Sequence, residues 1–290
     1  MAKQPRSLAG KTAIVTGATG GVGGALARAL AREGVKVALA DLDQEKLDTV
    51  AAEIGGDAIG MALDVSDREA FSAYIDEVES RLGPLDILCN VAAIMPVGDF
   101  DLEKPATSDR IIEINLLGVI HSTKDAAHRM KRRGSGHIIN VASGAGWIAG
   151  GGGATYCASK FGVVGYSESV ALELRGTGVD ISVIAPAVIK TEMSTGLAEV
   201  RGVRAVEPSE VADAIVECLK QPRFAVFVPK AIGVMSMSFA AIPYRARHFI
   251  ARVAKTDKLL LSADMSKRAD YEHRVEGRET AAIGKGSGDE

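Results

Sequence analysis

The chain alternates short apolar runs with amphipathic stretches along most of its length, and this order restricts its fold more than any other feature. The apolar runs predict buried strands at residues 12–17, 35–41, 57–65, 85–93, 136–143, 179–186 and 224–229. The stretches between them predict helices at residues 21–34, 44–56, 67–83, 107–133, 154–175 and 208–222. Continuous apolar strands separated by helices are typical of a parallel sheet buried on both faces. We therefore expect an α/β fold with a doubly wound, Rossmann-type parallel sheet.

The domain organisation follows from where this alternation stops. A chain of 290 residues can form one large α/β domain or two small ones. No linker-like segment interrupts the pattern before residue 230, so we expect one catalytic domain over residues 1–229, with a substrate loop at about 190–206. Residues 230–279 are expected to form a helical extension. Residues 280–290 are small and polar, which predicts a disordered tail.

The charge and the cysteines exclude several classes of protein. A net charge of -3 argues against a protein that binds nucleic acid, because such a protein needs a basic surface. The three cysteines, Cys89, Cys157 and Cys218, are scattered and form no CxxC pair. We therefore expect neither a disulfide framework nor a metal site. The N-terminal residues lead directly into the first strand without a signal-peptide pattern, so a cytoplasmic location is expected.

A glycine-rich turn directly follows the first expected strand and opens the first helix. Such a turn lets the backbone approach a pyrophosphate, which the free N–H groups and the dipole of the helix N-terminus then bind. Its position between a strand and a helix makes the signal much more specific than the glycines alone. The residues expected to contact the cofactor here are Gly17, Thr19, Gly20, Gly21, Val22 and Gly23.

An acidic residue stands at the end of the second expected strand. The carboxylate of Asp41 can accept hydrogen bonds from an adenosine ribose and would repel a 2′-phosphate. The next residue is Leu42, which offers no positive charge to such a phosphate. This pair favours NAD over NADP as the cofactor. The alternative is that Asp41 only caps the N-terminus of the following helix.

A tyrosine and a lysine stand four residues apart on the helix expected at 154–175. Tyr156 and Lys160 are therefore neighbours, and an adjacent ammonium group would lower the pKa of the phenol from about 10. Ser143 follows an expected strand thirteen residues before Tyr156, at the sheet edge where a cofactor crevice lies. Asn115 falls inside an expected helix, where asparagine is a poor helix former. Alone, the tyrosine–lysine spacing would indicate only a surface pair, but with Ser143 it predicts acid–base chemistry.

Together these motifs resemble the short-chain dehydrogenases/reductases over residues 8 to about 229. The TGxxxGxG turn and the YxxxK pair match the short, single-domain branch, although Gly17, Gly20 and Gly23 also fit the longer epimerase pattern. The resemblance implies that Tyr156 is the acid/base and that Lys160 binds the nicotinamide ribose. It also implies that Ser143 orients the reacting oxygen and that Asn115 holds a water that links Lys160 to solvent.

The same resemblance implies further cofactor contacts along the sheet edge. Asp64 and Val65 would contact the adenine, and Ile189 and Thr191 would bind the carboxamide. Two departures from the family pattern are visible. The usual Asn-Asn-Ala-Gly is Asn90-Val91-Ala92-Ala93, which retains the asparagine, and the usual Pro-Gly is Pro186-Ala187. Asn90, Ala92 and Pro186 are expected beside the cofactor.

The predicted function is an NAD-dependent oxidoreductase that interconverts a lipophilic secondary alcohol and its ketone. One alternative is a 3-oxoacyl-type carbonyl reductase that uses the same residues. Another is a non-catalytic NAD-binding scaffold, which would have no need of all of Asn115, Ser143, Tyr156 and Lys160. The identity of the substrate and the direction of the reaction stay open.

The region after residue 230 has several interpretations. Residues 231–244 are apolar, and residues 230–258 contain six Lys/Arg and one acidic residue. We favour a helix that packs on the substrate pocket or on another subunit, and the alternative is peripheral contact of 231–258 with a membrane.

Small residues on the helices expected at 107–133 and 154–175 predict a homotetramer, with a dimer as the alternative. They include Ala126, Ala127, Ala158, Gly162 and Gly165.

Overall fold

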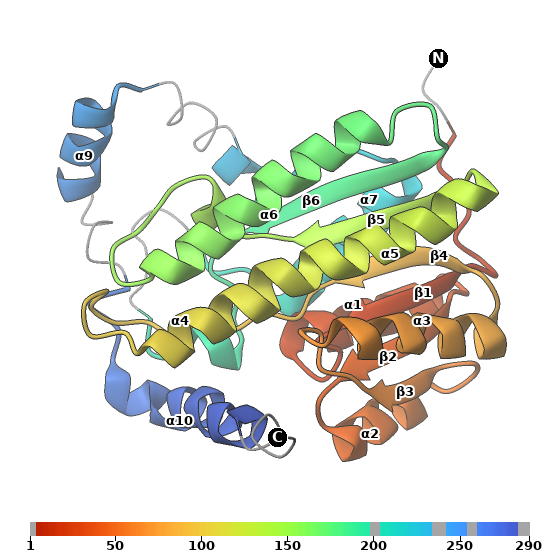
Figure 1. Ribbon diagram of the computed structural model, residues 1–290. Helices are drawn as coiled ribbons and strands as arrows, with labels where there is room; N and C mark the ends of the chain where they lie inside the picture. Colours follow the sequence, from red (N-terminus) through yellow and green to blue (C-terminus); the bar gives the residue numbers. More distant parts are fainter. Residues whose placement is uncertain (1–3, 198–203, 234–241, 254–259, 284–290) are drawn as a thin grey trace, which may run out of the picture.

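The described residues fold around a parallel sheet of seven strands (Figure 1). The computed structural model describes residues 4–197, 204–233, 242–253 and 260–283. The strands stand in the order β3-β2-β1-β4-β5-β6-β7, and each neighbouring pair is parallel. Their bounds are Thr12–Thr16 (β1), Lys36–Asp41 (β2), Ile59–Ala62 (β3), Leu85–Asn90 (β4), Gly136–Val141 (β5), Val179–Pro186 (β6) and Ala225–Val228 (β7). The predicted doubly wound α/β fold is confirmed.

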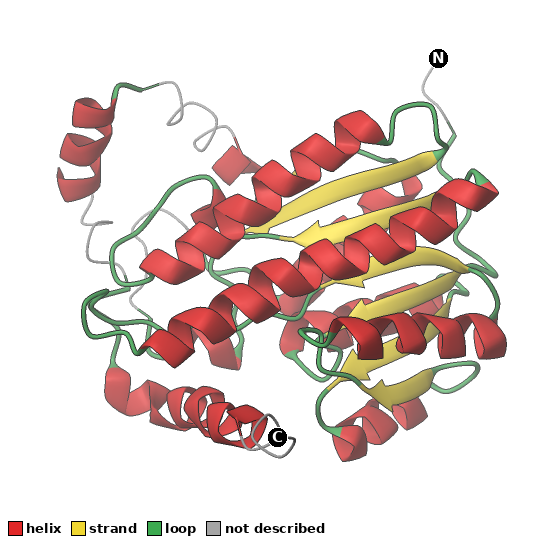
Figure 2. Ribbon diagram, viewed as in Figure 1, coloured by secondary structure: helices red, strands yellow, loops and turns green. Residues whose placement is uncertain are grey.

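Helices cover both faces of the sheet (Figure 2). Along β1, Ala13 and Val15 pack into one core layer and Ile14 into the other, as the two-residue period of a strand requires. The first layer is covered by α1 (Gly21–Arg32), α2 (Gln44–Ile54) and α7 (Pro208–Lys220). The second layer is covered by α3 (Arg68–Leu82), α5 (Gly118–Arg133) and the C-terminal part of α6 (Ala154–Glu173).

The strand order places a crevice at the carboxyl edge of the sheet. β1 is flanked by β2 on one side and by β4 on the other, so the chain leaves β1 in one direction and later returns on its opposite side. In open α/β sheets, ligands bind at such a switch point, beyond the carboxyl ends of the strands. The segments after β1, β2, β4 and β5, which carry most of the predicted site residues, all meet here.

The helix expected at 107–133 contains a π-helical turn. It begins as α4 (Pro105–Ile112), continues as the π-helix η1 (Glu113–Leu117) and ends as α5. Asn115 lies in this π-turn and is fully buried. Such turns are rare in helices and are found frequently at functional sites. A Cβ at Gly118 would lie 2.8 Å from the main-chain oxygen of Val65, so the helix passes close to the segment after β3.

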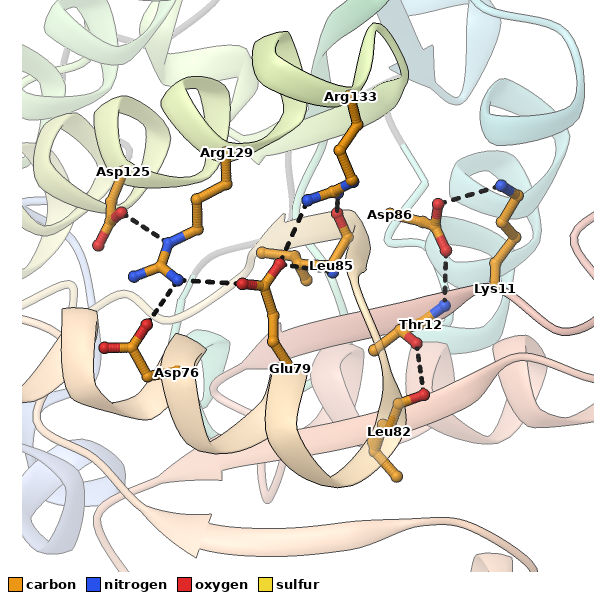
Figure 3. A network of polar contacts seen from close by, with 10 residues as sticks. All are labelled: Lys11, Thr12, Asp76, Glu79, Leu82, Leu85, Asp86, Asp125, Arg129 and Arg133. Atoms are coloured by element: carbon orange, nitrogen blue, oxygen red, sulfur yellow. Dashed lines mark hydrogen bonds and ion pairs between the residues drawn. The ribbon is translucent and has the colours of Figure 1, made fainter.

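A polar network at the opposite edge of the sheet ties α3 to α5 (Figure 3). Arg129 forms ion pairs with Asp76, Glu79 and Asp125, at 2.6, 3.0 and 2.9 Å. Arg133 also pairs with Glu79, at 3.2 Å. This network lies at the amino end of β4, far from the carboxyl edge, so it stabilises the packing of the helices without entering the crevice.

The C-terminal extension contains two helices, α9 (Tyr244–Val253) and α10 (Met265–Ile283). Residues 234–241 and 254–259, which make up about half of the expected membrane-contact segment, lie outside the described residues, as do 284–290. The tail expected from residue 280 overlaps the end of α10, which runs to Ile283. Among the helices that the structure describes, none has the length and apolarity to cross a membrane. α10 runs beside α4 (Figure 1), and its residues Tyr271, Arg274 and Val275 line the crevice.

Candidate active site

The glycine turn after β1 leaves room for a ligand at the N-terminus of α1. Gly17 has a φ of 66°, and a Cβ there would lie 2.9 Å from the Cα of Ala92. A Cβ at Gly23 would lie 2.1 Å from the main-chain oxygen of Gly17, so only glycine permits the turn to close on the helix. No side chain caps α1 at Gly20. The N-terminal N–H groups are therefore open to an anionic ligand, which fits the diphosphate of a dinucleotide.

Asp41 ends β2 beside this turn, and its carboxylate lies at the wall of the crevice. One carboxylate oxygen accepts hydrogen bonds from the main-chain N and the Oγ1 of Thr19, at 3.0 and 2.6 Å. The other accepts the N–H of Leu42 at 2.8 Å. The cap of α2 is instead Asp43, which accepts the N–H of Lys46. The alternative that Asp41 is only a helix cap is therefore wrong.

Asp64 is held by a residue that sequence reasoning missed. Arg110 on α4 donates to the Asp64 carboxylate at 2.6 Å and to the Oγ of Ser66 at 2.6 Å. Burial acts to raise the pKa of Asp64, but the hydrogen bonds from Ser66 and Arg110 outweigh it, so the pKa is lowered. Asp64, Val65 and Arg110 all line the crevice. No local pattern marks Arg110, because its partner lies 46 residues earlier in the chain.

Asn90 does not line the crevice, although the resemblance placed it beside the cofactor. Its amide donates to Asn140 at 2.9 Å, and its oxygen accepts the hydroxyl of Ser122 at 3.0 Å. Asn90 is 4% exposed and belongs to a polar cluster behind the wall. The cofactor contact expected for its side chain is therefore not supported, and the cluster instead fixes β4 against α5.

Asn115 also lies behind the wall rather than in it. Its Oδ1 accepts the N–H of Ile94 at 2.9 Å, and its Nδ2 donates to the Ile94 oxygen at 2.8 Å. The same Nδ2 lies 3.3 Å from the Oγ of Ser159, the residue before Lys160. Asn115 thus joins the loop after β4 to α6 and positions both. Its role in holding a water near Lys160 stays a prediction.

Tyr156 and Lys160 lie on the inner face of α6, and both line the crevice. The Lys160 ammonium is 5.8 Å from the centroid of the Tyr156 ring and donates to the main-chain oxygen of Val141 at 3.1 Å. Burial lowers the pKa of Lys160 to about 8. Burial also raises the pKa of Tyr156 to about 12, although a hydrogen bond with Ser143 acts in the opposite direction. The expectation of a lowered Tyr156 pKa is wrong for the protein alone, because burial is the larger effect.

Ser143 is brought to Tyr156 by a tight turn after β5. Its Oγ accepts the N–H of Ala145 at 3.1 Å and caps the short 3₁₀-helix η2 (Gly144–Gly146). A Cβ at Gly146 would lie 2.7 Å from the main-chain oxygen of Lys160, so this turn packs directly on α6. A hydroxyl, a phenol and an ammonium group therefore converge on one point at the sheet edge. Such a set can hold a substrate oxygen and exchange a proton with it.

The expected nicotinamide end of the site is formed by the segment after β6. Pro186, Ile189 and Thr191 line the crevice as predicted. Thr191 and Ser194 form reciprocal hydrogen bonds at the start of the 3₁₀-helix η3 (Glu192–Ser194). A Cβ at Gly21 would lie 2.8 Å from the Cγ2 of Thr191, so this segment lies directly over the glycine turn.

The crevice is one continuous cavity of about 850 Å³. All of the predicted site residues except Asn90 and Asn115 line it. Further lining residues fall partly in regions expected to form the pocket. Met193 and Leu197 lie in the expected substrate loop, and the C-terminal extension contributes Ile232, Leu260, Tyr271, Arg274 and Val275. Sequence reasoning missed Ile94, Met95 and Ile148.

Comparisons with known proteins agree with this geometry. The family model described as short chain dehydrogenase matches residues 11–201. The D-threitol dehydrogenase of Mycolicibacterium smegmatis is 40% identical over 192 residues, which cover 64% of this chain and 73% of that protein.

Two solved structures are also similar to the chain. A short-chain dehydrogenase/reductase from Burkholderia phymatum in complex with NAD superposes with a TM-score of 0.74 at 26% identity, and covers 80% of this chain and 93% of that one. A metagenomic short-chain oxidoreductase in complex with NADP has a TM-score of 0.67 at 36% identity, over 77% of this chain and 98% of that one. Because the family model spans most of the sheet and both sequence motifs of the cavity, the chain belongs to the short-chain dehydrogenase/reductase family.

Proposed function

We propose that the protein is an NAD-dependent oxidoreductase that interconverts a lipophilic secondary alcohol and its ketone. The observation that carries the proposal is the single cavity that joins Asp41 at one end to Ser143, Tyr156 and Lys160 at the other. A bound nicotinamide dinucleotide would accept or deliver the hydride. The residues of this chain position the reactants and move the proton.

Tyr156 exchanges the proton with the reacting oxygen. In the reduction of a ketone, the neutral phenol donates its proton to the carbonyl oxygen, and in the oxidation of an alcohol the phenolate accepts one. The Ser143 hydroxyl hydrogen-bonds the same oxygen and orients it. Lys160 places a positive charge beside the phenol, which favours the phenolate form when oxidation requires it.

The choice of NAD is supported by Asp41. A carboxylate at this end of the cavity would accept hydrogen bonds from the ribose hydroxyls and repel a 2′-phosphate. Hydrogen bonds from Thr19 and Leu42 hold its two oxygens in place. One observation favours NADP as the second candidate. Lys46 also lines this end of the cavity, with its ammonium group 2.9 Å from Asp43. Lys46 therefore offers a cation at the end of the cavity where a 2′-phosphate would bind.

A lipophilic substrate is supported by the apolar part of the cavity. Met95, Val97, Tyr156 and Leu260 form one buried cluster, against which Met193 and Leu197 pack. Burying apolar surface contributes about 25 cal/mol per Å², so a hydrophobic substrate gains affinity here that a polyol does not. The alternative of a 3-oxoacyl-type carbonyl reductase is favoured by one observation, the raised pKa of Tyr156. That pKa keeps the phenol protonated, as reduction requires.

We also propose a homo-oligomer, a tetramer or else a dimer, in the cytoplasm. An exposed stripe on α6, with Ala158, Phe161, Gly165 and Leu172, supports contact with a second subunit. Gly162 instead packs against Leu116 of its own chain. Ala126 and Ala127 are 0% and 9% exposed and pack in the core, so their expected place at a subunit interface is wrong. The cytoplasmic location is supported by three buried, unpaired cysteines.

The alternative of peripheral membrane contact rests on α9. Arg245, Phe249 and Arg252 are exposed on this helix, and Phe249 is 69% exposed. We favour the packed interpretation for the extension as a whole, because α10 returns to the cavity and supplies part of its wall.

The test is the formation of reduced cofactor, followed by absorbance, with NAD and NADP across steroid, retinoid, acyl and sugar alcohols. We expect turnover of apolar secondary alcohols with NAD, and a loss of about 10² to 10⁴-fold in Tyr156→Phe. Tyr166→Phe is the matched control, because Tyr166 lies on the same helix but outside the cavity wall. No turnover of any alcohol with either cofactor would favour the scaffold alternative. Preference for sugar alcohols would contradict the lipophilic assignment.

A further inference from the structure

Helix α10 binds both main-chain polar groups of Met95, which lies in the loop after β4. The N–H of Met95 donates to the hydroxyl of Tyr271 at 2.7 Å. The oxygen of Met95 accepts a hydrogen bond from Arg268 at 2.8 Å. The Met95 side chain packs in the same buried cluster as Tyr156. The position of α10 is therefore coupled directly to the wall of the reaction centre.

Arg268 holds α10 and the loop after β4 together. Its side chain is 0% exposed, and it also donates to the main-chain oxygens of Met193 and Thr195, at 2.7 and 3.1 Å. Its Nε donates to Glu272 at 2.8 Å. One guanidinium thus joins the loop after β4, the loop after β6 and α10, with a carboxylate that neutralises its charge. The fork geometry of arginine makes this possible, because one planar group offers five N–H donors.

Tyr271 is presented to the cavity by the same contacts. The Arg268 guanidinium carbon lies 5.0 Å from the centroid of the Tyr271 ring, and Tyr271 lines the cavity. Burial raises the pKa of Tyr271, so the phenol is neutral. Tyr156 lies near enough that its charge would raise the pKa of Tyr271 further. The phenols of Tyr156 and Tyr271 therefore line the same part of the cavity.

The hydroxyl of Tyr271 has a proton to donate. It accepts the N–H of Met95, and in the part of the chain that the structure describes no acceptor lies within hydrogen-bonding distance of its own O–H. A phenol O–H that faces a cavity and has no acceptor in the protein is available to hydrogen-bond a ligand. A ligand oxygen in the cavity would satisfy it.

We propose that Tyr271 is a substrate-binding residue whose hydroxyl donates a hydrogen bond to a second oxygen of the substrate, distinct from the reacting oxygen at Ser143 and Tyr156. The proposal rests on the proposed function and narrows its substrate class. The substrate is a lipophilic secondary alcohol or ketone with a further neutral oxygen, such as a carbonyl, hydroxyl or ether. An anionic group is disfavoured, because Arg268 and Arg274 are already paired with Glu272 and Glu192.

The test compares matched substrates that differ by one oxygen. The pairs are 1-tetralol with 4-chromanol, and 5α-androstan-17β-ol with 17β-hydroxy-5α-androstan-3-one. For the pair that the wild-type enzyme turns over, the member with the additional oxygen should have a kcat/KM about tenfold higher, as one net hydrogen bond gives. In Tyr271→Phe this preference should fall to less than about twofold, through KM, while kcat for the member without the oxygen changes little.

The design of the test variant and one control variant separate binding from a structural effect. Tyr271→Phe retains the ring over Arg268, and loss of the acceptor for Met95 would affect both members of a pair equally. Tyr74→Phe removes another buried hydroxyl, which has no partner among the described residues and lies outside the cavity wall, and it should leave the preference intact. Turnover without preference in the wild type, or an equal loss for both members in Tyr271→Phe, would overturn the proposal. Turnover of no member with either cofactor would contradict the proposed function itself.

Discussion

The ammonium group of Lys160 lies 5.8 Å from the ring centroid of Tyr156, and both side chains are almost completely buried. Burial moves the two groups in opposite directions, since it raises the pKa of the phenol to about 12 and lowers that of the lysine to about 8. In the protein alone, both groups therefore shift toward their neutral forms. The free energy of unfolding should therefore depend on pH through these two groups.

The first prediction concerns the pH dependence of stability. The folded-state pKa of Lys160, about 8, lies below its ordinary value of 10.5, so between these values the folded protein binds fewer protons than the unfolded chain. The free energy of unfolding should therefore rise with pH across this window, by up to about 1.4 kcal/mol per pH unit from this group. Lys160→Met should remove that rise.

Urea unfolding at pH 7.5, 8.5 and 9.5 measures this rise, as the difference in unfolding free energy between the wild type and Lys160→Met. Tyr156 contributes only above its ordinary pKa of 10.0. Burial also raises the pKa values of Cys89 and Cys157 from 9.0, and the difference between wild type and variant cancels their contribution. Parallel pH profiles for the two proteins would show that Lys160 titrates normally in the fold.

The second prediction concerns cofactor choice. Asp41→Ala should lower kcat/KM for NAD by about tenfold or more, because hydrogen bonds to a charged acceptor contribute about 1.5–3 kcal/mol. It should also relieve the repulsion of NADP, and adding Leu42→Arg should make NADP the preferred cofactor.

The matched control is Glu45→Gln, which removes an exposed charge on α2 that does not line the cavity. Steady-state kcat/KM with both cofactors provides the readout. If the wild type already prefers NADP, Lys46 rather than Asp41 decides the specificity, and Lys46→Met should then abolish that preference.

The third prediction concerns the buried arginine of α10. Arg268→Lys keeps the charge but cannot donate to Met95, Met193, Thr195 and Glu272 at once. We expect KM for the substrate to rise about tenfold or more, while the Kd for NADH, measured by fluorescence, stays within about twofold. Lys267→Met, an exposed neighbour, should change neither value. An equal loss of NADH affinity in Arg268→Lys would mean that α10 supports the whole cavity rather than its substrate end.

The fourth prediction concerns the network at the opposite edge of the sheet (Figure 3). Arg129→Met leaves Asp76, Glu79 and Asp125 without their shared cation. Arg129 is 19% exposed, so we expect a loss of about 1–3 kcal/mol in unfolding free energy with kcat unchanged. Arg132→Met, on the exposed face of the same helix, is the control. A fall in kcat with stability unchanged would connect this network to the site.

The strands, the crevice and most of its polar residues could be predicted because each depends on a local pattern. Gly17 and Gly23 are required by a turn of a few residues, and Tyr156 and Lys160 are neighbours on any helix. The features that were missed depend on contacts across the chain. Arg268 reaches Met95 over 173 residues, and no spacing rule connects them.

The two asparagines and the pKa of Tyr156 show a second limit. Asn90 and Asn115 were recognised as important, but only the structure shows that their amides bind other protein groups behind the cavity wall. The four-residue spacing of Tyr156 and Lys160 predicted that the ammonium would lower the pKa of the phenol. Burial, which the spacing does not report, is the larger effect.

The most direct test of the central claim is isotope transfer from the carbinol carbon. The alcohol that the substrate panel identifies is prepared with deuterium on that carbon and incubated with NAD and enzyme, and the reduced cofactor is analysed by mass spectrometry. We expect one deuterium at the nicotinamide ring for the wild type, and a rate lower by about 10² to 10⁴-fold for Tyr156→Phe. Unlabelled NADH, or equal rates for the two proteins, would contradict it.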